Sequence, residues 1–378
     1  MWNCHSLTRI DFRVIPVILS LMIISLLIIS SFSELHSPDR IEEGFFTPVV
    51  KNQIRWFVMG WGVFLFFAAF DYNKLREWTW ALYAIVLVLL VGLFFTGSIV
   101  GVNRWYRIPF LNFSAQPSEL AKLVVVITLS WFLERKKQQS DRLSTVFGAG
   151  LIVGIPFLLI LKQPDLGTAI ILFPITLVMF YFGNVNSFVV RIMAWFGGAL
   201  LLLVALIFLN VISHEELRPY ATKVLKNYQF DRLDPNTHHQ KAAATAIAIG
   251  GLTGTGWKKG EYTSRGWLPA AYTDSVFPAF GEEFGFLGLV FLLALLYSLI
   301  YFSFQVTAVA KDHFGRLLSA GVAVYLAMHI LLNIGMMCGL MPITGVPLIL
   351  VSYGGSSTLL TMSALGILQS IYSRRFMF

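Results

Sequence analysis

Long apolar runs alternate with short polar breaks along most of this chain, and the runs have the length of membrane-spanning helices. Such a helix needs about 17 to 25 mainly apolar residues. The pattern predicts spans at approximately 14–32, 56–72, 78–96, 118–134, 146–162, 166–183, 190–211, 284–305, 316–337 and 356–372. We therefore expect an all-α membrane protein with ten transmembrane helices.

Composition supports this fold class. Hydrophobic residues make up 57% of the 378 residues and charged residues 13%, whereas soluble proteins carry about 25% charged residues. We expect a single polytopic membrane domain over residues 1–378, with one large outer loop at about 212–283 between the seventh and eighth helices. The first run follows two arginines, as in a signal peptide, but no small-residue cleavage site follows it, so we expect an uncleaved helix.

Basic residues set the expected orientation, because short cytoplasmic loops are enriched in lysine and arginine. With the N-terminus inside, thirteen basic residues lie in short inner loops and six in short outer loops. The inner residues are Arg9, Arg13, Lys74, Arg76, Arg135, Lys136, Lys137, Arg142, Arg191, Lys311, Arg316, Arg374 and Arg375, and the outer ones are Arg40, Lys51, Arg55, Arg104, Arg107 and Lys162. Both termini are therefore expected to be cytoplasmic. The net charge of +8 then reflects orientation and attraction to anionic lipid, not nucleic-acid binding.

Several charged residues lie where a bilayer makes charge costly. Lys122 follows Glu119 by three residues on one helix face, so the two can pair, and a functional role and a structural ion pair are equally supported. Asp165 begins the next helix, where capping alone explains it. Arg104 and Arg107 flank two aromatic residues, which by itself is more typical of an interfacial belt than of a site.

Asp274 is an isolated carboxylate in the stretch GWLPAAYTDSVFPAF, just before the eighth apolar run. It can cap the following helix, or it can be a catalytic base whose pKa is raised by burial. The local residues support the two roles equally. In the capping interpretation, Glu282 and Glu283 add helix-terminal charge.

The segment GLMPITGVPLILVSYGGSS between the last two helices contains prolines, glycines and hydroxyls but no charge. Irregular apolar backbone is tolerated at membrane depth only where it is buried in protein or lines a cavity. We therefore predict a re-entrant segment, with Ser352 and Ser356 as candidate substrate-binding residues. The expected topology places this segment and the charged residues above on the outer side. Cations there suit an anionic headgroup such as a phosphate, and the surrounding helices suit a lipid tail.

The outer loop is expected to contain its own structure. We expect a short helix after Pro219, a helix over the alanine-rich stretch HHQKAAATAIAIG, and a turn at GGLTGTGWKKGE. The glycine cluster has no Lys-Ser/Thr after it and no strand before it. A tight turn is therefore predicted there, not a phosphate-binding loop.

Five stretches together resemble the SEDS family (shape, elongation, division and sporulation), in the family's order. They are NRWYRIPFLNFSAQPSELAKL, KQPDLGTA, GGLTGTGW, TDSVFPAFGEEFGFLG and NIGMMCGLMPITGVPLILVSYGGSS. Pro347 makes the last stretch similar to the RodA elongation branch of the family, not to the FtsW division branch. The resemblance implies a peptidoglycan glycosyltransferase that polymerises lipid II on the outer face of the cytoplasmic membrane. It also implies a class B penicillin-binding protein as transpeptidase partner, together with other membrane proteins of the elongation complex.

The same resemblance assigns roles to residues. Asp274 matches the family's essential acid, and Arg104, Glu119, Lys122 and Asp165 match its other motif residues. Asp274 would accept the proton of the attacking sugar hydroxyl as a general base, and a single displacement predicts inversion at the anomeric carbon. A divalent cation, Mg²⁺ or Mn²⁺, would suit a pyrophosphate leaving group. No metal-ligand spacing is visible, so the sequence leaves the cofactor open.

Two functions of other classes also fit these residues. A flippase or transporter of lipid-linked precursors is compatible with broken helices and buried charges, although convincing inverted repeats are absent from the sequence. A non-catalytic scaffold that recruits a transpeptidase would need Asp274 only for structure.

Overall fold

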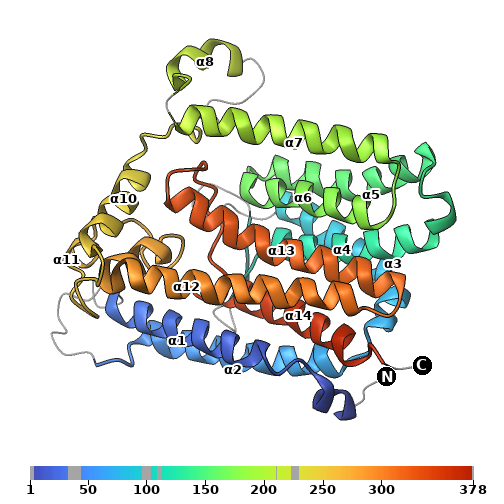
Figure 1. Cartoon of the computed structure of the whole chain (residues 1–378), viewed down its shortest axis with the longest axis horizontal. Helices are drawn as coiled ribbons and strands as arrows, with labels where there is room; N and C mark the ends of the chain where they lie inside the picture. The colour runs from blue at the N-terminus through green and yellow to red at the C-terminus, as the bar shows by residue number, and fades with distance from the viewer. Residues whose placement is uncertain are drawn as a thin grey trace.

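The computed structural model describes residues 4–32, 44–95, 104–108, 113–209, 211–222 and 230–376, and these form an elongated bundle of long helices (Figure 1). Within these ranges, a helix of at least 17 residues overlaps each apolar run of the sequence. The long helices are α1 (Val14–Phe32), α2 (Pro48–Ala69), α3 (Leu75–Gly92), α4 (Pro117–Arg135), α5 (Leu143–Lys162), α6 (Leu166–Phe182), α7 (Ser187–Phe208), α12 (Val276–Val309), α13 (His313–Met337) and α14 (Gly355–Ser373).

The remaining elements are short. The outer loop contains α8 (His214–Ala221), α10 (His238–Gly250) and α11 (Glu261–Ser264), and 3-10 turns occur at η1 (Cys4–Arg9), η3 (Tyr72–Lys74), η4 (Leu93–Phe95) and η6 (Lys137–Gln139). Strands β1 (Tyr106–Ile108) and β2 (Phe113–Ala115) pair antiparallel just before α4, with Tyr106 opposite Ala115. Among the described residues, six helical segments are individually long and apolar enough to cross a membrane. The chain is therefore an α-helical membrane protein.

The helix α13 forms the centre of the bundle. Nearly all of its residues are buried, and it packs against α4, α6, α12 and α14. In contrast, α7 lies at the edge of the bundle (Figure 1) and buries only Ile207 and Phe208 at its last turn. The many apolar side chains that α7 exposes form the kind of surface that contacts lipid or another protein.

The two ends of the bundle differ in structure. At one end, the segment before α1 meets the last helix: the Asp11 backbone N–H donates to the Gln369 side chain at 2.8 Å, and η1 packs against α14. The helices α10 and α11 lie at the other end (Figure 1), which is also the end at which α12 begins. The outer-loop helices α10 and α11 therefore lie at the end of the bundle opposite η1.

The outer loop follows its sequence pattern in part. The alanine-rich stretch forms α10, as predicted, and the glycine-rich stretch turns, with positive φ at Gly251, Gly254 and Gly256. A helix, α8, runs from His214 and includes Pro219, while residues 223–229, where the helix expected after Pro219 would continue, lie outside the described residues. Two acidic residues in the first turn of α8 favour its start at His214, since they face the positive end of the helix dipole.

Two glutamates anchor this loop to α12. Glu282 accepts hydrogen bonds from the backbone N–H groups of 262–263 at 2.8 and 3.0 Å. Glu283 accepts from the Lys258 N–H at 2.9 Å and from the Ser31 hydroxyl at 3.0 Å. Both carboxylates are buried, and neither lies in the first turn of α12, so they do not act as the helix-terminal charges of the capping interpretation. Buried acceptors of this kind need such donors, and the loop backbone provides them.

Candidate active site

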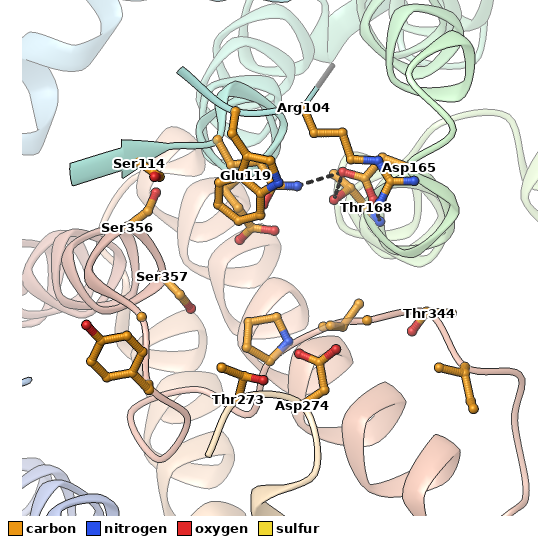
Figure 2. A pocket seen from close by; sticks show the side chains of 18 of the residues that line it. Arg104, Ser114, Glu119, Asp165, Thr168, Thr273, Asp274, Thr344, Ser356 and Ser357 are labelled. Atoms are coloured by element: carbon orange, nitrogen blue, oxygen red, sulfur yellow. Dashed lines mark hydrogen bonds between the residues drawn. The ribbon is translucent and has the colours of Figure 1, made fainter. Parts of the chain in front are cut away.

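A cavity of about 830 Å³ lies where several helices begin. Its described lining comes from α2 (Trp56), the strand pair and its approach (Arg104, Trp105, Ser114), α4 and its approach (Gln116, Glu119), α6 and its cap (Asp165, Thr168), the outer loop (Asp231, Arg232, Thr237, Thr273, Asp274) and residues 343–347 and 353–357 before and at the start of α14. Figure 2 shows Thr273 and Asp274 on one wall, with Arg104, Glu119 and Asp165 on the facing wall. Residues far apart in the sequence therefore meet at one cavity.

Five of the seven site residues expected from the sequence line this cavity. They are Arg104, Glu119, Asp165, Asp274 and Ser356. Lys122 and Ser352 are buried behind the lining. Lining residues that the sequence analysis did not single out include Asp231, Arg232 and Tyr353, which carried no local signal because each lies in an ordinary loop or turn pattern.

The Asp274 carboxylate faces the cavity without a bonding partner. None of the described side chains or N–H groups forms a hydrogen bond or ion pair with it, and the α12 cap residue, Ser275, makes no side-chain capping bond. Gly345, in the segment before α14, lies close to this carboxylate, since a Cβ added there would lie 3.5 Å from Asp274 Oδ2. Burial raises the pKa of Asp274, because a low-dielectric environment disfavours the charged form. The geometry therefore does not support the capping explanation for this residue.

The backbone at Asp274 is held in place by the buried amide of Asn333. Its Nδ2 donates to the Asp274 carbonyl at 2.9 Å and to the Val346 carbonyl at 2.8 Å. One side chain of α13 therefore joins the loop before α12 to the irregular segment before α14. Because Asn333 is fully buried, this bridge lies away from solvent, where hydrogen bonds are strong.

The residues on either side of Asp274 are held as well. The Ser352 hydroxyl donates to the Thr273 carbonyl and accepts from the Leu348 N–H at 2.9 Å. His239 of α10 lies 2.6 Å from the Ser275 hydroxyl. The predicted segment before α14 is irregular, as expected, and nearly all of its residues are buried or partly buried. Ser352 in it supports the loop that carries Asp274.

A buried polar cluster lies beneath the opposite wall. Lys122 donates to Glu119 Oε1 at 2.7 Å, and its Nζ lies 2.6 Å from Nε2 of His329. Lys122 and His329 are completely buried, whereas Glu119 reaches the cavity. The predicted ion pair is confirmed, and His329 is a member that the sequence analysis missed. Its signal was a histidine in an apolar run, four residues before Asn333 on the same face of α13.

Asp165 and Arg104 hold the start of α6. Asp165 Oδ1 accepts the Thr168 N–H at 3.3 Å, as expected of a cap, while Oδ2 accepts from Gln116 and Ser118, both at 2.8 Å. Arg104 donates from Nε to a backbone carbonyl of the turn between α5 and α6 at 3.0 Å, and from Nη2 to the next carbonyl. Nη1 of this guanidinium bonds to no described residue and can serve a ligand. The side chain of Arg107 lies outside the described part of the structure.

The acids of this site do not form a metal centre. Across the described ranges, no three His, Cys, Asp or Glu side chains lie close enough together to hold a metal ion. Asp165 and Glu119 already accept hydrogen bonds from neighbours on their own wall. Among the described residues this excludes a metal site built from three such side chains, whereas Mg²⁺ held by one or two carboxylates together with substrate phosphates needs no such cluster.

Comparison with known proteins gives consistent similarity along the chain. Residues 12–375 match the family model described as "Cell cycle protein", which covers FtsW, RodA and SpoVE. The chain is 31% identical to the peptidoglycan glycosyltransferase MrdB of Escherichia coli K12, over 97% of this chain and 94% of that protein. It is 28% identical to the probable peptidoglycan glycosyltransferase FtsW of Trichlorobacter lovleyi, over 97% and 93%.

Solved structures agree with this similarity. A chain from a structure of a peptidoglycan synthase complex, concerned with coordination of polymerization and crosslinking, superimposes with a TM-score of 0.77 at 25% identity, over 98% of this chain and 99% of that one. The rod shape determining protein RodA of Thermus thermophilus superimposes with a TM-score of 0.69 at 22% identity, over 98% of both chains. At 22% identity, the similarity to this RodA structure shows a shared fold alone.

The fold and the cavity define a helical membrane protein with a charged site at one end of its bundle. Every stretch that carried the resemblance in the sequence lies within the matched residues. The chain belongs to the FtsW, RodA and SpoVE family, the SEDS family of the sequence analysis.

Proposed function

We infer that this chain is a peptidoglycan glycosyltransferase, which joins the disaccharide units of lipid II into glycan strands. Family membership supports the activity. The 31% identity to MrdB, against 28% to the FtsW relative above, supports the RodA elongation branch and hence a role in cell shape. A cavity with charged walls inside a lipid-facing bundle suits a substrate that has a sugar pyrophosphate head and a lipid tail.

Asp274 is the general base in this proposal. The 4-hydroxyl oxygen of one sugar attacks the anomeric carbon of the other, and the bond from that carbon to the lipid pyrophosphate breaks. Asp274 accepts the hydroxyl proton as the new glycosidic bond forms. A single displacement inverts the anomeric centre. The observation that carries this role is the position of Asp274, a carboxylate without a described partner that lines the cavity.

The facing wall suits the leaving group. Pyrophosphate gains negative charge as it departs, and fixed cationic donors stabilise such charge. Arg104 and Arg232 are the lining cations, and Nη1 of Arg104 has no described partner. Lys122 acts indirectly, because it holds Glu119 in place from beneath the wall. Asp165 shapes the turn that positions Arg104, while Ser352 holds the Asp274 loop and Ser356 offers a hydroxyl to the substrate.

The membrane arrangement follows from the same proposal. We take all ten long helices as spans of one polytopic domain in the cytoplasmic membrane, with both termini inside. The outer loop, about 212–283, and the cavity then lie on the extracytoplasmic side, where lipid II is polymerised. The basic residues of the turns at the opposite end of the bundle support this orientation.

A class B penicillin-binding protein is the proposed partner. Its transpeptidase activity crosslinks the strands that a polymerase produces, and the similar chain described above comes from a structure concerned with polymerization and crosslinking. Other membrane proteins of the elongation complex would join the pair. The apolar surface that α7 exposes is one candidate for such contacts.

Purified protein in liposomes with lipid II distinguishes this function from its rivals. We expect glycan strands from the wild type and none from Asp274→Ala. Transbilayer movement of lipid II without strands would instead identify a carrier. No strands and no movement, with transpeptidase binding intact in both proteins, would identify a scaffold.

A further inference from the structure

A second cavity lies at the end of the bundle opposite Asp274. It has a volume of about 510 Å³ and is formed by the last turns of α6 and α12 and the first turn of α13. Arg316, which lines it, precedes Asn333 by 17 residues on α13. At about 1.5 Å per residue, the two cavities are therefore separated by about 25 Å along this helix. The second cavity is not part of the site already described.

Arg316 is a cation without a partner at this cavity. Its side chain is exposed, and its guanidinium makes no hydrogen bond or ion pair with any residue in the described ranges. The nearest acid in sequence, Asp312, is occupied elsewhere, because it accepts from Tyr72 and pairs with Arg76. A guanidinium left over in this way can bind an anion from outside the chain.

Thr307 is an unsatisfied hydroxyl on the same lining. It is 4% exposed, and its Oγ1 has no hydrogen-bond partner among the described residues. Hydroxyls in a helix usually bond the carbonyl four residues earlier, as Ser303 does to Leu299 on the same helix at 2.7 Å. A buried hydroxyl without a partner costs free energy. Because Oγ1 is itself buried, rotation of the Thr307 side chain toward the cavity that it lines would bring the hydroxyl to a ligand there.

The rest of the lining is mainly aromatic. Phe182 and Phe304 form inner walls, and Tyr181 lies exposed at the margin. The site therefore combines the guanidinium of Arg316, the hydroxyl of Thr307 and the amide of Asn184 with largely aromatic walls. Free phosphate would match the polar groups only, whereas a phospholipid would match the walls as well.

We propose that this cavity binds the headgroup of an anionic phospholipid from the cytoplasmic leaflet. The phosphate accepts hydrogen bonds from Arg316 and Thr307, and an acyl chain lies against the aromatic walls. Basic pockets between transmembrane helices on the cytoplasmic side bind anionic headgroups in this way. The proposal uses the inferred membrane orientation but not the catalytic role of Asp274, so the two can fail separately.

Lipid binding to the purified full-length chain tests the proposal. Native mass spectrometry would follow retention of phosphatidylglycerol by the wild type, Arg316→Gln, Thr307→Val and the control Arg191→Gln. Arg191 is also an exposed arginine, near the start of α7 at this end, but it bonds the Ser187 carbonyl and does not line either cavity. We expect affinity to fall about tenfold or more in Arg316→Gln, about threefold to tenfold in Thr307→Val, and little in Arg191→Gln.

Two further ligands show whether the bound phosphate belongs to an anionic lipid or to a free phosphate compound. Zwitterionic phosphatidylcholine should bind the wild type more weakly than phosphatidylglycerol, and glycerol 3-phosphate should not displace the lipid. Equal loss in Arg316→Gln and Arg191→Gln would overturn the proposal. Equal binding of the two lipids, or displacement by glycerol 3-phosphate, would overturn it too. Unaltered thermal unfolding of the variants would show that each result reflects binding.

Discussion

At the scale of single residues, the site contains two ionisable side chains with different surroundings, the partly buried Asp274 and the fully buried Lys122. Asp274 has no described partner and faces a cavity, whereas Lys122 has two polar neighbours and is sealed from it. A carboxylate left without a partner is costly, so its pKa rises and it becomes a better proton acceptor. The Lys122 ammonium, which is paired, instead holds Glu119 and His329 in place. Their different surroundings therefore suit them to different roles.

The pH dependence of activity should reveal the environment of Asp274. Because burial raises its pKa above the ordinary 3.8, the carboxylate becomes protonated at a higher pH than an exposed aspartate does. We expect kcat/KM for lipid II polymerisation to fall as pH decreases through that raised pKa. The same shift makes the folded state bind a proton more tightly than the unfolded state, so this residue's contribution to stability declines as pH rises through that window. An acid limb at or below 3.8 would exclude Asp274 as the base.

Lys122 should matter far more for stability than an exposed lysine in a similar pair. Lys122→Met leaves Glu119 as a buried charge without a partner, and loss of one member of a buried pair costs about 3–5 kcal/mol. The control is Lys74→Met, which removes an exposed pair to Glu77 with the same 2.7 Å distance and three-residue spacing. Thermal unfolding should show a large decrease in Tm for the first variant and little change for the second. Equal decreases would contradict the structural role of the buried cluster.

At the scale of elements, α13 connects the two walls of the cavity. His329 and Asn333 lie four residues apart, so they project from the same face. The first contacts the Lys122 cluster and the second holds the backbone at Asp274. Both were visible as polar residues within an apolar run. What each contacts depends on helices distant in the sequence, which local patterning does not encode.

Asn333→Leu should impair turnover more than substrate binding. The change leaves the carbonyls of Asp274 and Val346 without their donor, so the base shifts while the opposite wall stays intact. We expect kcat to fall about tenfold or more, with a smaller change in KM, because misplacement of a reacting group is expensive. Asn186→Ala is the control, since it removes a hydrogen bond from a side-chain amide to a carbonyl, that of Asp141 at 3.2 Å, together with the N-cap of α7, far from the cavity. A similar effect of both variants on kcat would argue against positioning by Asn333.

At the scale of the whole molecule, hydrophobic patterning predicted where the long helices lie but not where all of them begin. The helix α2 starts at Pro48, ahead of the expected 56, and α12 includes a stretch from Val276 that a kink at Gly285 separates from the run predicted at 284. Both extensions carry polar residues, such as Lys51 and Glu282, which a search for apolar runs leaves out. In α12 the carboxylates of Glu282 and Glu283 accept hydrogen bonds from backbone N–H groups of the outer loop. That compensation depends on tertiary contacts, so the sequence alone could not reveal it.

The sequence predicted part of the candidate site, as it predicted part of the arrangement of the helices. The count of basic residues predicted that one side of the membrane holds the charged residues Arg104, Arg107, Glu119, Lys122, Asp165 and Asp274. In the structure, Arg104, Glu119, Asp165 and Asp274 line one cavity. The supporting contacts of Ser352 and Asn333 were not predictable, because each bonds a carbonyl and carbonyls carry no sequence signal.

Cysteine labelling in intact cells checks the proposed orientation of the molecule. In a background with both native cysteines replaced by serine, Gln139→Cys lies in the turn after α4 and Ser264→Cys in the outer loop. A membrane-impermeant thiol reagent should label the second position and reach the first only after the membrane is opened. The reverse pattern would invert the topology and place the cavity on the wrong side for lipid II polymerisation.

The most direct measurement of the central claim compares two carboxylates of the same cavity. Asp274→Asn removes the proton acceptor without loss of a described contact, so the protein should remain folded and bind lipid II. Its polymerisation rate should nevertheless fall about 10²- to 10⁴-fold. Asp231→Asn changes an exposed lining acid that pairs with Arg218 at 3.6 Å, and its rate should change only a few-fold. If Asp274→Asn polymerises lipid II as well as Asp231→Asn does, the proton acceptor lies elsewhere and the account is wrong.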